Sequence, residues 1–511
     1  MKVPLTIRDF LDRALVVYPD RVAFVDEPDQ PAPGMGEVTF RRMGELADAM
    51  GAGLDRLGVP MGGRVAMVSA NAGRLLAGFW GVSGNGRVFV PINYRLSHGE
   101  VGYIVGHCGA DVLLVDPELG EAMAGIECEH TFVLGDESDS ALLDFDSTPA
   151  MWRPDEDATA VINYTSGTTA RPKGVQQTHR SLWLNATVFG WQSSVSDRDV
   201  YLHTLPMFHC NGWGMPYALV GMGARQIVLR KVEGAEILRR VDAHGVSLMC
   251  GAPAVVAAIL DAAQEWDGAI PGAGRTRIIV AGAPPPTRTI ERVETELGWE
   301  FIQIYGLTET APLLTMNRCR SEWDDLPPSE RARKLGRAGA PALGVRIELD
   351  AGGEILSRTN HNLDGYWEQP EATAEAIVDG WFHTGDGGYV DDDSYIAITD
   401  RKKDVIISGG ENVSSIEVED ALFSHPAVAE VAVIGVPHDK WGETVKALVV
   451  PAAGADVDEQ TLIDHCRERI AHYKCPTSVE FRDVLARTAT GKLQKFKLRA
   501  PYWESMEKSV N

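Results

Sequence analysis

One eleven-residue stretch carries the most information about this chain: Tyr164-Thr-Ser-Gly-Thr-Thr-Ala-Arg-Pro-Lys-Gly174. It combines four Ser/Thr hydroxyls, two glycines and one lysine, and it follows the apolar run 160–162, which is typical of the end of a buried strand. Hydroxyls, free backbone N–H groups and a lysine charge are what a loop needs to bind a polyphosphate. The order differs from a Walker A loop, which ends in Gly-Lys-Ser/Thr. The alternative interpretation is a polar surface loop, although this density of Ser, Thr, Gly and Lys is unusual in an ordinary turn.

The composition is that of an acidic globular protein. A chain of 511 residues predicts about three domains of roughly 150 residues, or one large composite unit and a small one. Hydrophobic residues make up 44%, which is enough for a sizeable core. The net charge of −24 argues against nonspecific binding to nucleic acid or an anionic membrane, but it leaves room for a local basic pocket.

The cysteines and the first residues indicate the compartment. Seven cysteines are scattered without a Cys-x-x-Cys pair, which predicts free thiols in a reducing cytoplasm and suggests no metal site. Pro4, Arg8 and Asp9 interrupt the first ten residues, so these lack the apolar core of a signal peptide. No run of eighteen apolar residues occurs, and we expect a cytoplasmic protein without a transmembrane helix.

Strand-like and helix-like segments alternate through the first two thirds of the chain. Apolar runs predict strands at 64–69, 87–91, 110–115, 225–229 and 277–281, and a helix is predicted over 72–80. This alternation predicts an α/β fold with mainly parallel sheets. After Gly336, apolar and polar residues alternate around glycines at 344–349 and 353–357, which predicts antiparallel strands.

A compact charged break, Asp400-Arg-Lys-Lys-Asp404, predicts a domain boundary. We expect an N-terminal domain at 1–400, a hinge at 401–404 and a C-terminal domain at 405–511. The last unit has about 110 residues, which is enough for an independent domain. Its pattern predicts helices at 416–423 and 459–472 and strands at 430–436 and 446–450. The charged stretch 321–334 is interpreted as a solvated loop without a function.

Four further segments follow the first one in an order that resembles the adenylate-forming (ANL) superfamily, in its acyl-CoA synthetase or acid–CoA ligase type. They are Ala281-Gly-Ala-Pro284 with Tyr305-Gly-Leu-Thr-Glu309, Gly380-Trp-Phe-His-Thr-Gly-Asp386, the segment 400–412, and Arg487-Thr-Ala-Thr-Gly-Lys492. With weaker matches they span residues from about 60 to 500. The resemblance implies a large N-terminal domain of parallel-sheet α/β subdomains with a small antiparallel barrel, and a small mobile α+β C-terminal domain.

The resemblance implies a nucleotide site for ATP and AMP. The phosphates would contact the first stretch through Thr165, Ser166, Gly167, Thr168, Thr169 and Lys173. The adenine would lie against Gly282, Ala283, Pro284, Tyr305 and Gly306, where a glycine lets the backbone approach a flat base. Asp386 would accept hydrogen bonds from the ribose hydroxyls, and Arg401 would reach the ribose or a phosphate. Taken alone, Asp386 is also consistent with an ordinary turn residue.

Four residues are implied in the chemistry. Thr308 would contact phosphate, and Glu309 would hold Mg²⁺ together with substrate phosphates; the alternative for this segment is a helix start capped by Thr308. Lys492 would be the catalytic lysine, although a lysine on such a loop is ordinarily solvated. His209 would gate the acyl site, or would simply pack beside Phe208.

The C-terminal domain is implied in binding of CoA. Lys403 falls at the hinge position, and Ser408, Gly409, Gly410 and Trp441 would follow the pantetheine arm; the alternative is an interdomain linker with a glycine turn. An apolar acyl pocket is predicted from Phe208, His209, Trp213, Met215 and 311–314. Gly212 and Gly214 are interpreted as leaving space for a bulky acid.

The resemblance implies an enzyme, an AMP-forming acid–thiol ligase, that activates a carboxylic acid as acyl-AMP with ATP and transfers the acyl group to CoA. The family usually has glycine where this chain has Ala170. A positive φ there would cost alanine about 1–2 kcal/mol. One alternative is therefore an adenylation-impaired ligase that mainly converts a supplied acyl-adenylate. A second alternative, independent of Ala170, is a nucleotide-binding protein without turnover. A homodimer is one candidate assembly.

Overall fold

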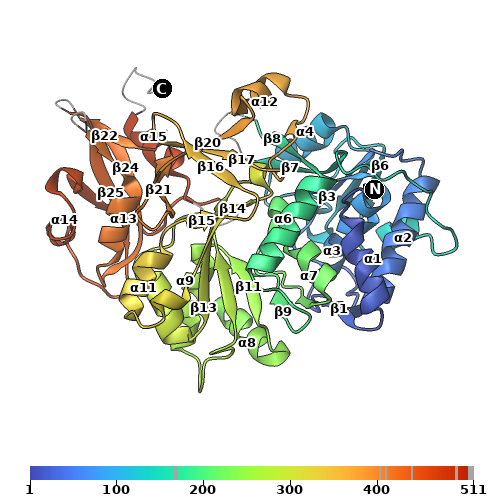
Figure 1. Cartoon of the computed structure of the whole chain (residues 1–511), viewed down its shortest axis with the longest axis horizontal. Helices are drawn as coiled ribbons and strands as arrows, with labels where there is room; N and C mark the ends of the chain where they lie inside the picture. The colour runs from blue at the N-terminus through green and yellow to red at the C-terminus, as the bar shows by residue number, and fades with distance from the viewer. Residues whose placement is uncertain (166–170, 402–403, 409–410, 439–440, 489–492, 504–511) are drawn as a thin grey trace.

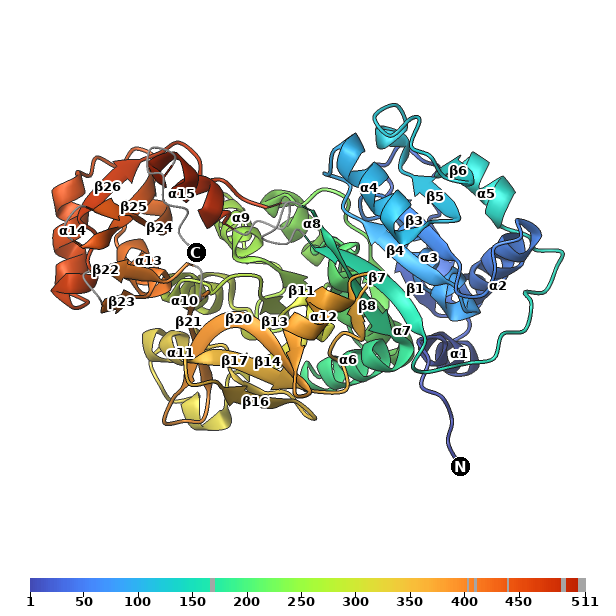
Figure 2. The same cartoon turned by 90° about the horizontal axis from the view of Figure 1, so that it is seen from above.

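The computed structural model describes residues 1–165, 171–401, 404–408, 411–438, 441–488 and 493–503. Both views place the chain from β22 (Ile406–Ser408) onward at one end of the molecule and the first α/β layer, in blue, at the other end (Figures 1 and 2). The larger second sheet and a smaller antiparallel sheet lie between these ends. No helix in the described ranges is both long and apolar enough to cross a membrane.

The first sheet positions the eleven-residue stretch. In spatial order its seven described strands are β18 (Gly365–Tyr366), β8 (Lys173–Thr178), β7 (Thr159–Thr165), β4 (Val88–Ile92), β3 (Arg64–Val68), β5 (Val112–Val115) and β6 (His130–Val133). The strands from β7 to β6 are parallel, whereas β8 and β18 are antiparallel to their neighbours. β7 and β8 therefore form a hairpin whose connection is the expected phosphate loop.

The second sheet is the larger one. In spatial order its nine described strands are β15 (Ala340–Pro341), β14 (Leu313–Arg318), β13 (Glu300–Gly306), β12 (Arg277–Val280), β11 (Leu248–Gly251), β9 (Val200–Leu202), β10 (Arg225–Ile227), β1 (Val22–Val25) and β2 (Glu37–Thr39). Strands β13 to β1 are parallel. The carboxyl ends of β12 and β13 are therefore neighbours, and they lead into the segments that begin at Ala281 and Leu307. The predicted parallel α/β architecture is confirmed.

Helices cover both sheets. They are α1 (Arg8–Val17), α2 (Phe40–Arg56), α3 (Gly73–Gly81), α4 (His98–Cys108), α5 (Asp136–Leu142), α6 (His179–Gln192), α7 (Met215–Met222), α8 (Gly234–His244), α9 (Pro253–Gln264) and α10 (Thr287–Arg292). α2 shows why such helices form: Thr39 caps its first turn by accepting from Arg42 N, and Met43, Leu46 and Met50 recur on one face at helical spacing.

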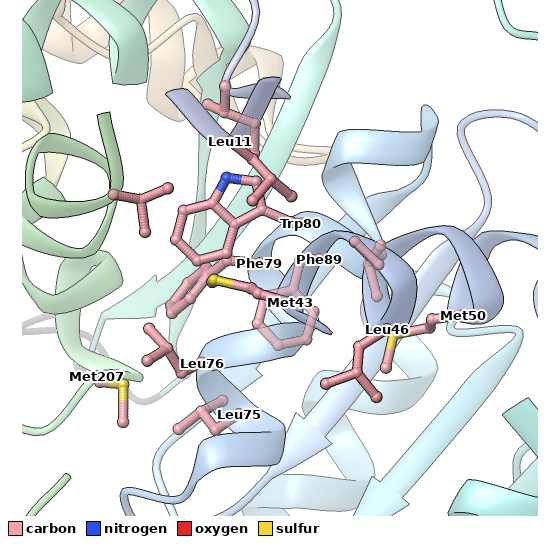
Figure 3. Packing of buried hydrophobic residues seen from close by; sticks show 14 of the residues in the cluster. Leu11, Met43, Leu46, Met50, Leu75, Leu76, Phe79, Trp80, Phe89 and Met207 are labelled. Carbon is pink, nitrogen blue, oxygen red and sulfur yellow. The ribbon is translucent and has the colours of Figure 1, made fainter. Parts of the chain in front are cut away.

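That face packs into the core drawn in Figure 3, where Met43 lies near Phe79, Trp80 and Phe89. Trp80 is fully buried, and its ring lies 5.6 Å from that of Tyr217 in an edge-on arrangement. Replacing a buried tryptophan of this kind by alanine costs about 3–5 kcal/mol. The cluster packs α1, α2 and α3 against β4 of the first sheet.

A five-stranded antiparallel sheet occupies the place of the expected barrel. Its described strands are β16 (Arg346–Leu349), β17 (Glu354–Arg358), β19 (Ile377–Val378), β20 (Trp381–Val390) and β21 (Ile396–Arg401), beside the short helix α12 (Pro370–Ala376). β16 and β17 confirm the antiparallel strands predicted from their alternating pattern. The pairings of the described strands follow an open path from β16 to β19, and β21 pairs with β20.

The C-terminal unit is a small α+β domain. Its described elements after β22 are β23 (Glu411–Val413), α13 (Ser415–Phe423), β24 (Val428–His438), β25 (Gly442–Pro451), α14 (Glu459–Arg467), β26 (Ser478–Phe481) and α15 (Lys495–Trp503). The predicted helix 459–472 ends at Arg467. The chain becomes extended at Ala471, so that Ile470 packs on the core of the unit and a short turn starts at His472.

The interpretation of 321–334 as a solvated loop is wrong. A 3-10 turn, Ser321–Trp323, is followed by the helix α11 (Pro328–Leu335). Pro328 is suited to the first turn of a helix, and Ala332 and Leu335 are buried one turn apart. Trp323 is also buried, against Tyr395 at 5.8 Å between ring centroids. These buried apolar residues hold the segment to the core, although its many charges suggested a solvated loop.

Candidate active site

The β7–β8 hairpin holds the two flanks of the phosphate stretch. Thr165 lies opposite Lys173 in the register, so both flanking residues lie on the same face of the hairpin. The ammonium of Lys173 lies 4.7 Å from the ring centroid of Tyr366. Ser166, Gly167, Thr168 and Thr169 lie outside the described residues, as does Ala170.

The other face of the hairpin is held by α4. The Tyr164 hydroxyl lies 2.7 Å from Nδ1 of His107, and the guanidinium of Arg171 lies 5.4 Å from the ring centroid of Tyr103. α4 is itself fixed at its start by a capping box, in which Ser97 and Glu100 bond each other's backbone N–H. One helix therefore anchors the residues on both sides of the undescribed loop.

Tyr366 connects the hairpin to Glu309. Its hydroxyl donates to Oε1 of Glu309 at 3.0 Å, while its ring faces the ammonium of Lys173. Burial, and then the neighbouring Glu309 carboxylate, raise the pKa of the Tyr366 hydroxyl, which keeps it a neutral donor. Sequence reasoning missed Tyr366; the sign that could have found it is the Gly365-Tyr366-Trp367 run, where aromatics follow a glycine.

Thr308 and Glu309 lie in a short 3-10 turn, Thr308–Thr310, just after β13. The alternative in which Thr308 caps a helix is wrong, because Leu307 holds the cap position and its N–H donates to Oγ1 of Thr310 at 2.9 Å. Gly306 is required here, since a Cβ at this position would lie 1.5 Å from the carbonyl oxygen of Pro312. The backbone of this turn is thus closely packed.

Tyr305 and Asp386 meet across two sheets. The Tyr305 hydroxyl donates to Oδ2 of Asp386 at 2.9 Å, and Asp386 is buried on β20 opposite Arg401 of β21. Gly282 follows β12 with a φ of +94° and with open space where a Cβ would stand. Ala283 and Pro284 complete this turn at the carboxyl end of β12, the edge of a parallel sheet where ligands usually bind.

The expected acyl segment has an uncommon backbone. Cys210, Asn211 and Trp213 have φ values of +47°, +54° and +62°, in a run with Gly212 and Gly214. A left-handed backbone costs a residue with a side chain roughly 1–2 kcal/mol. His209 is half-buried at the start of this run, and Phe208 packs edge-on against Tyr94 at 5.8 Å.

The two glycines of this run do not open a pocket, contrary to our expectation. Both have positive φ, and a Cβ at Gly214 would lie 2.5 Å from Nδ2 of Asn185, while one at Gly212 would lie 3.2 Å from Cδ of Pro216. Close packing against Asn185 therefore explains Gly214, and the positive φ with a tight contact to Pro216 favours Gly212. Other residues of the predicted pocket are buried: Met215, Ala311, Leu313 and Leu314.

The C-terminal residues are described in part. Ser408 lies on β22 opposite Glu411 and Gly442, and the Trp441 ring is stacked on His438 at 4.5 Å. Lys403, Gly409, Gly410 and Lys492 lie outside the described residues. The two ends of the Lys492 loop meet, because Arg487 bridges to Leu493 and the Gln494 N–H donates to the carbonyl of Ala486.

A buried polar cluster follows the expected hinge. Asp400, at the end of β21, accepts from the backbone N–H of Ser415 at 2.9 Å, and Nζ of Lys495 lies 2.8 Å from Oε1 of Glu419. Burial opposes the charge on Lys495, but Glu419 and Asp400 outweigh it and raise the pKa of the ammonium. Nearby, Asp420 accepts from the N–H of Thr287 at 2.9 Å, which joins α13 to α10.

Comparison with known proteins agrees with this geometry. The family model "AMP-binding enzyme" matches residues 11–367, and the model "AMP-binding enzyme C-terminal domain" matches residues 417–492. The chain belongs to the AMP-binding enzyme family. It is an AMP-forming acid–thiol ligase of the acyl-CoA synthetase type, which uses ATP and CoA.

Several relatives of this AMP-binding enzyme have named activities. It is 35% identical to 4-hydroxybutyrate–CoA ligase 2 of Metallosphaera sedula, over 96% of this chain and 93% of the relative. It is also 35% identical to 2-methylpropanoate–CoA ligase CCL4 of Humulus lupulus, over 97% and 95%. Among solved structures, an anthranilate CoA ligase in complex with anthranoyl-AMP matches with a TM-score of 0.86 at 27% identity, covering 98% and 99% of the two chains.

Glu309 is the candidate metal ligand of the site. The described residues of this AMP-binding enzyme hold no group of three or more His, Cys, Asp or Glu side chains that could bind a metal ion. Glu309 lies beside the residues that are expected to contact phosphate. One carboxylate at this position fits a Mg²⁺ ion that is bound mainly through a nucleotide. The donor chemistry of the site therefore suits a metal that arrives with its substrate.

Proposed function

We propose that this enzyme activates a carboxylic acid as acyl-AMP, with release of pyrophosphate, and then transfers the acyl group to the thiol of CoA. One observation carries the proposal: Lys173, Tyr366 and Glu309, from three separate segments, are joined in one contact chain beside Thr308. A lysine and a carboxylate held together in this way suit a polyphosphate and its cation. The relatives named as CoA ligases support the same assignment.

In the first step the carboxylate of the acid attacks the α-phosphate of ATP. Negative charge grows on the phosphate and on the leaving pyrophosphate, and cations and N–H or O–H donors must stabilise it. We assign this role to Lys173, Thr168, Thr169, Thr308 and Lys492. Mg²⁺, when bound at Glu309, would neutralise part of the phosphate charge. Tyr366 would orient the Glu309 carboxylate.

The nucleoside would lie between Tyr305 and the turn 282–284. The hydrogen bond from Tyr305 fixes the orientation of Asp386, whose carboxylate has about four acceptor positions and can also serve a ribose diol. Arg401, opposite Asp386 in the register, is proposed to contact the ribose or a phosphate. This arrangement recognises AMP independently of the acid.

In the second step the CoA thiol attacks the acyl carbon and AMP leaves. We propose domains at 1–400 and 405–511, a hinge at 401–404 containing Lys403, and a rotation that exchanges Lys492 for Ser408, Gly409, Gly410 and Trp441. His209 would gate the acyl site during this exchange. The contact between Thr287 and Asp420 belongs to the orientation described here, and a rotation of the domain would break it.

The acid is proposed to be short and aliphatic. The relatives that share about a third of the sequence are named for 4-hydroxybutyrate, 2-methylpropanoate and acetate or butyrate. The predicted acyl segments are largely buried, Trp213 and Leu313 among them, and the two glycines add no space there. Both features favour a small acyl group.

A panel of acids and their synthetic adenylates tests the proposal. Each is incubated with CoA, with and without ATP, and thioester mass and pyrophosphate are measured. We expect thioester from short acids with ATP, with one pyrophosphate released per thioester. Thioester from adenylates only would instead support the ligase impaired by Ala170. Nucleotide binding without any product would contradict the proposal and support a non-catalytic protein.

A further inference from the structure

The left-handed run at 210–214 is tied to the segment 308–313 by buried amides. The amide of Asn163 donates to Oδ1 of Asn211 at 3.3 Å, and Nδ2 of Asn211 donates to Oε1 of Gln177 at 3.0 Å. Nε2 of Gln177 then donates to the carbonyl of Thr308 at 2.6 Å. Asn211 and Gln177 each accept from the amide before them and donate to the next group in this relay.

A second amide closes the other end of the same segment. Nδ2 of Asn185 donates to the carbonyl of Trp213 at 3.2 Å, and Oδ1 of Asn185 accepts from the N–H of Leu313 at 3.1 Å. Asn185, Asn211 and Gln177 are all fully buried. The run 210–214 is therefore held at two points, against Thr308, which precedes Glu309, and against Leu313, the first residue of β14.

The position of Gln177 extends this connection to the phosphate hairpin. Gln177 lies four residues after Lys173 on β8, and side chains two and four residues apart share one face of a strand. The face that carries Lys173 thus also carries the amide that bonds Thr308. Buried amides are costly when they lose a partner, so the relay allows little change in the separation of these segments.

We propose that Gln177, Asn211 and Asn185 are positioning residues, which set the distance between the acyl-binding run and the Thr308–Leu313 segment and so determine which acyl groups are accepted. This inference rests on the proposed function. The residues act through backbone carbonyl and N–H groups, and none of them is assigned contact with the reacting atoms. A misplacement of about 1 Å between such segments can cost roughly a hundredfold in rate.

Three variants, a Gln177→Leu comparison and one matched control test the inference. Gln177→Glu keeps the acceptor for Asn211 and loses the amide donor to Thr308. Asn211→Gly removes the middle of the relay, and it suits a φ of +54° better than any larger residue. Asn185→Asp keeps the acceptor for Leu313 and loses the donor to Trp213. Gln176→Glu makes the same change on the opposite face of β8, where Gln176 is half-buried, and is expected to match the wild type.

The binding of AMP and of a non-hydrolysable acyl-sulfamoyl adenosine is measured for each variant, together with kcat/KM for two acids that differ by one methylene. We expect AMP affinity to stay within about twofold, and affinity for the acyl mimic to fall about tenfold or more. A well-fitted pocket can prefer one of two such acids by roughly 10- to 200-fold in kcat/KM, and this ratio should also fall in the variants. Gln177→Glu should recover activity as the pH is lowered, because a neutral carboxylic acid can again donate to Thr308, and Gln177→Leu should not.

Two results would overturn the inference: variants that bind the acyl mimic as well as Gln176→Glu does, or equal losses for AMP and the mimic with unchanged preference between acids. Because binding is measured without turnover, these results remain separate from a failure of the proposed function, which would appear as absence of thioester from the wild-type enzyme with every acid.

Discussion

The hydroxyl of Tyr366 donates a 3.0 Å hydrogen bond to Oε1 of Glu309, and the same side chain presents its ring to the ammonium of Lys173. Tyr366 reaches both residues because β18 pairs with β8 at the edge of the first sheet, opposite Val175 in the register. The short strand β18 therefore joins the phosphate hairpin to Glu309, the proposed cation ligand.

Tyr366→Phe tests this connection. Loss of a hydrogen bond to a carboxylate is worth about 1.5–3 kcal/mol, so we expect kcat/KM for ATP to fall roughly 10- to 100-fold and the Mg²⁺ concentration at half-maximal rate to rise. Initial rates over a Mg²⁺ titration measure both quantities. Tyr473→Phe, at a side chain that is 54% exposed, is the matched control. An unchanged Mg²⁺ dependence in Tyr366→Phe would contradict the role given to this residue.

Asp386→Asn should weaken nucleotide binding. The amide keeps the size of the side chain but presents one acceptor oxygen where the carboxylate presents two, so a ribose diol and Tyr305 would compete for it. We expect AMP to bind about tenfold more weakly, which corresponds to roughly 1.4 kcal/mol, as measured by calorimetry. Asp392→Asn, on the exposed turn after β20, should bind AMP as the wild type does. Equal affinities in the two variants would argue against Asp386 as the ribose ligand.

Some of this site could be predicted from sequence, and some of it could not. Tyr305, Asp386 and the two flanks of the phosphate stretch belong to short local motifs, and the structure brings Tyr305 and Asp386 together. Tyr366, Gln177 and Asn185 each have a partner far along the chain, 57, 131 and 128 residues away, which no local pattern reveals.

The helices and strands also divide into those that the sequence predicts and those that it does not. Parallel strands were predictable because their apolar runs are continuous, whereas α11 was mistaken for a loop because its charges outnumber the two buried residues, Ala332 and Leu335, that hold it to the core. The end of α14 depends on Ile470 packing into the C-terminal unit, and a helical pattern in the sequence continues past that point.

Three buried histidines predict acid sensitivity. His179, His203 and His361 are buried, and burial lowers the pKa of each to about 4. Between pH 6.5 and 4 the unfolded chain binds protons that the folded protein does not. These groups therefore leave the free energy of unfolding unchanged above pH 6.5 and lower it as the pH falls through this window. Each contributes up to about 1.4 kcal/mol per pH unit to the free energy of unfolding.

His203→Gln isolates one of these contributions, since His203 contacts Oε1 of Gln226 at 3.0 Å inside the second sheet. Urea unfolding from pH 4.5 to 7 should show a shallower loss of stability at low pH than in the wild type. Parallel pH curves for the two proteins would mean that His203 does not gain a proton on unfolding.

Lys495→Met should destabilise the C-terminal unit. The substitution leaves Glu419 and Asp400 without a nearby ammonium, and removing one partner of a largely buried ion pair costs up to about 3–5 kcal/mol. We expect faster proteolysis after residue 400 and a larger loss of thioester formation than of AMP binding. Lys497→Met, at an exposed position on the same helix, serves as the control. Proteolysis at the same rate in both variants would show that the cluster contributes little.

A single-turnover reaction addresses the two-step chemistry itself. Enzyme in excess is mixed with ATP, Mg²⁺ and the best short acid, first without CoA, and products are separated by mass. One pyrophosphate and one acyl-AMP per ATP should form before CoA is added, and AMP and acyl-CoA should appear afterwards. Release of ADP and phosphate, or pyrophosphate formed only once CoA is present, would contradict an acyl-adenylate made at the site of Lys173, Glu309 and Asp386.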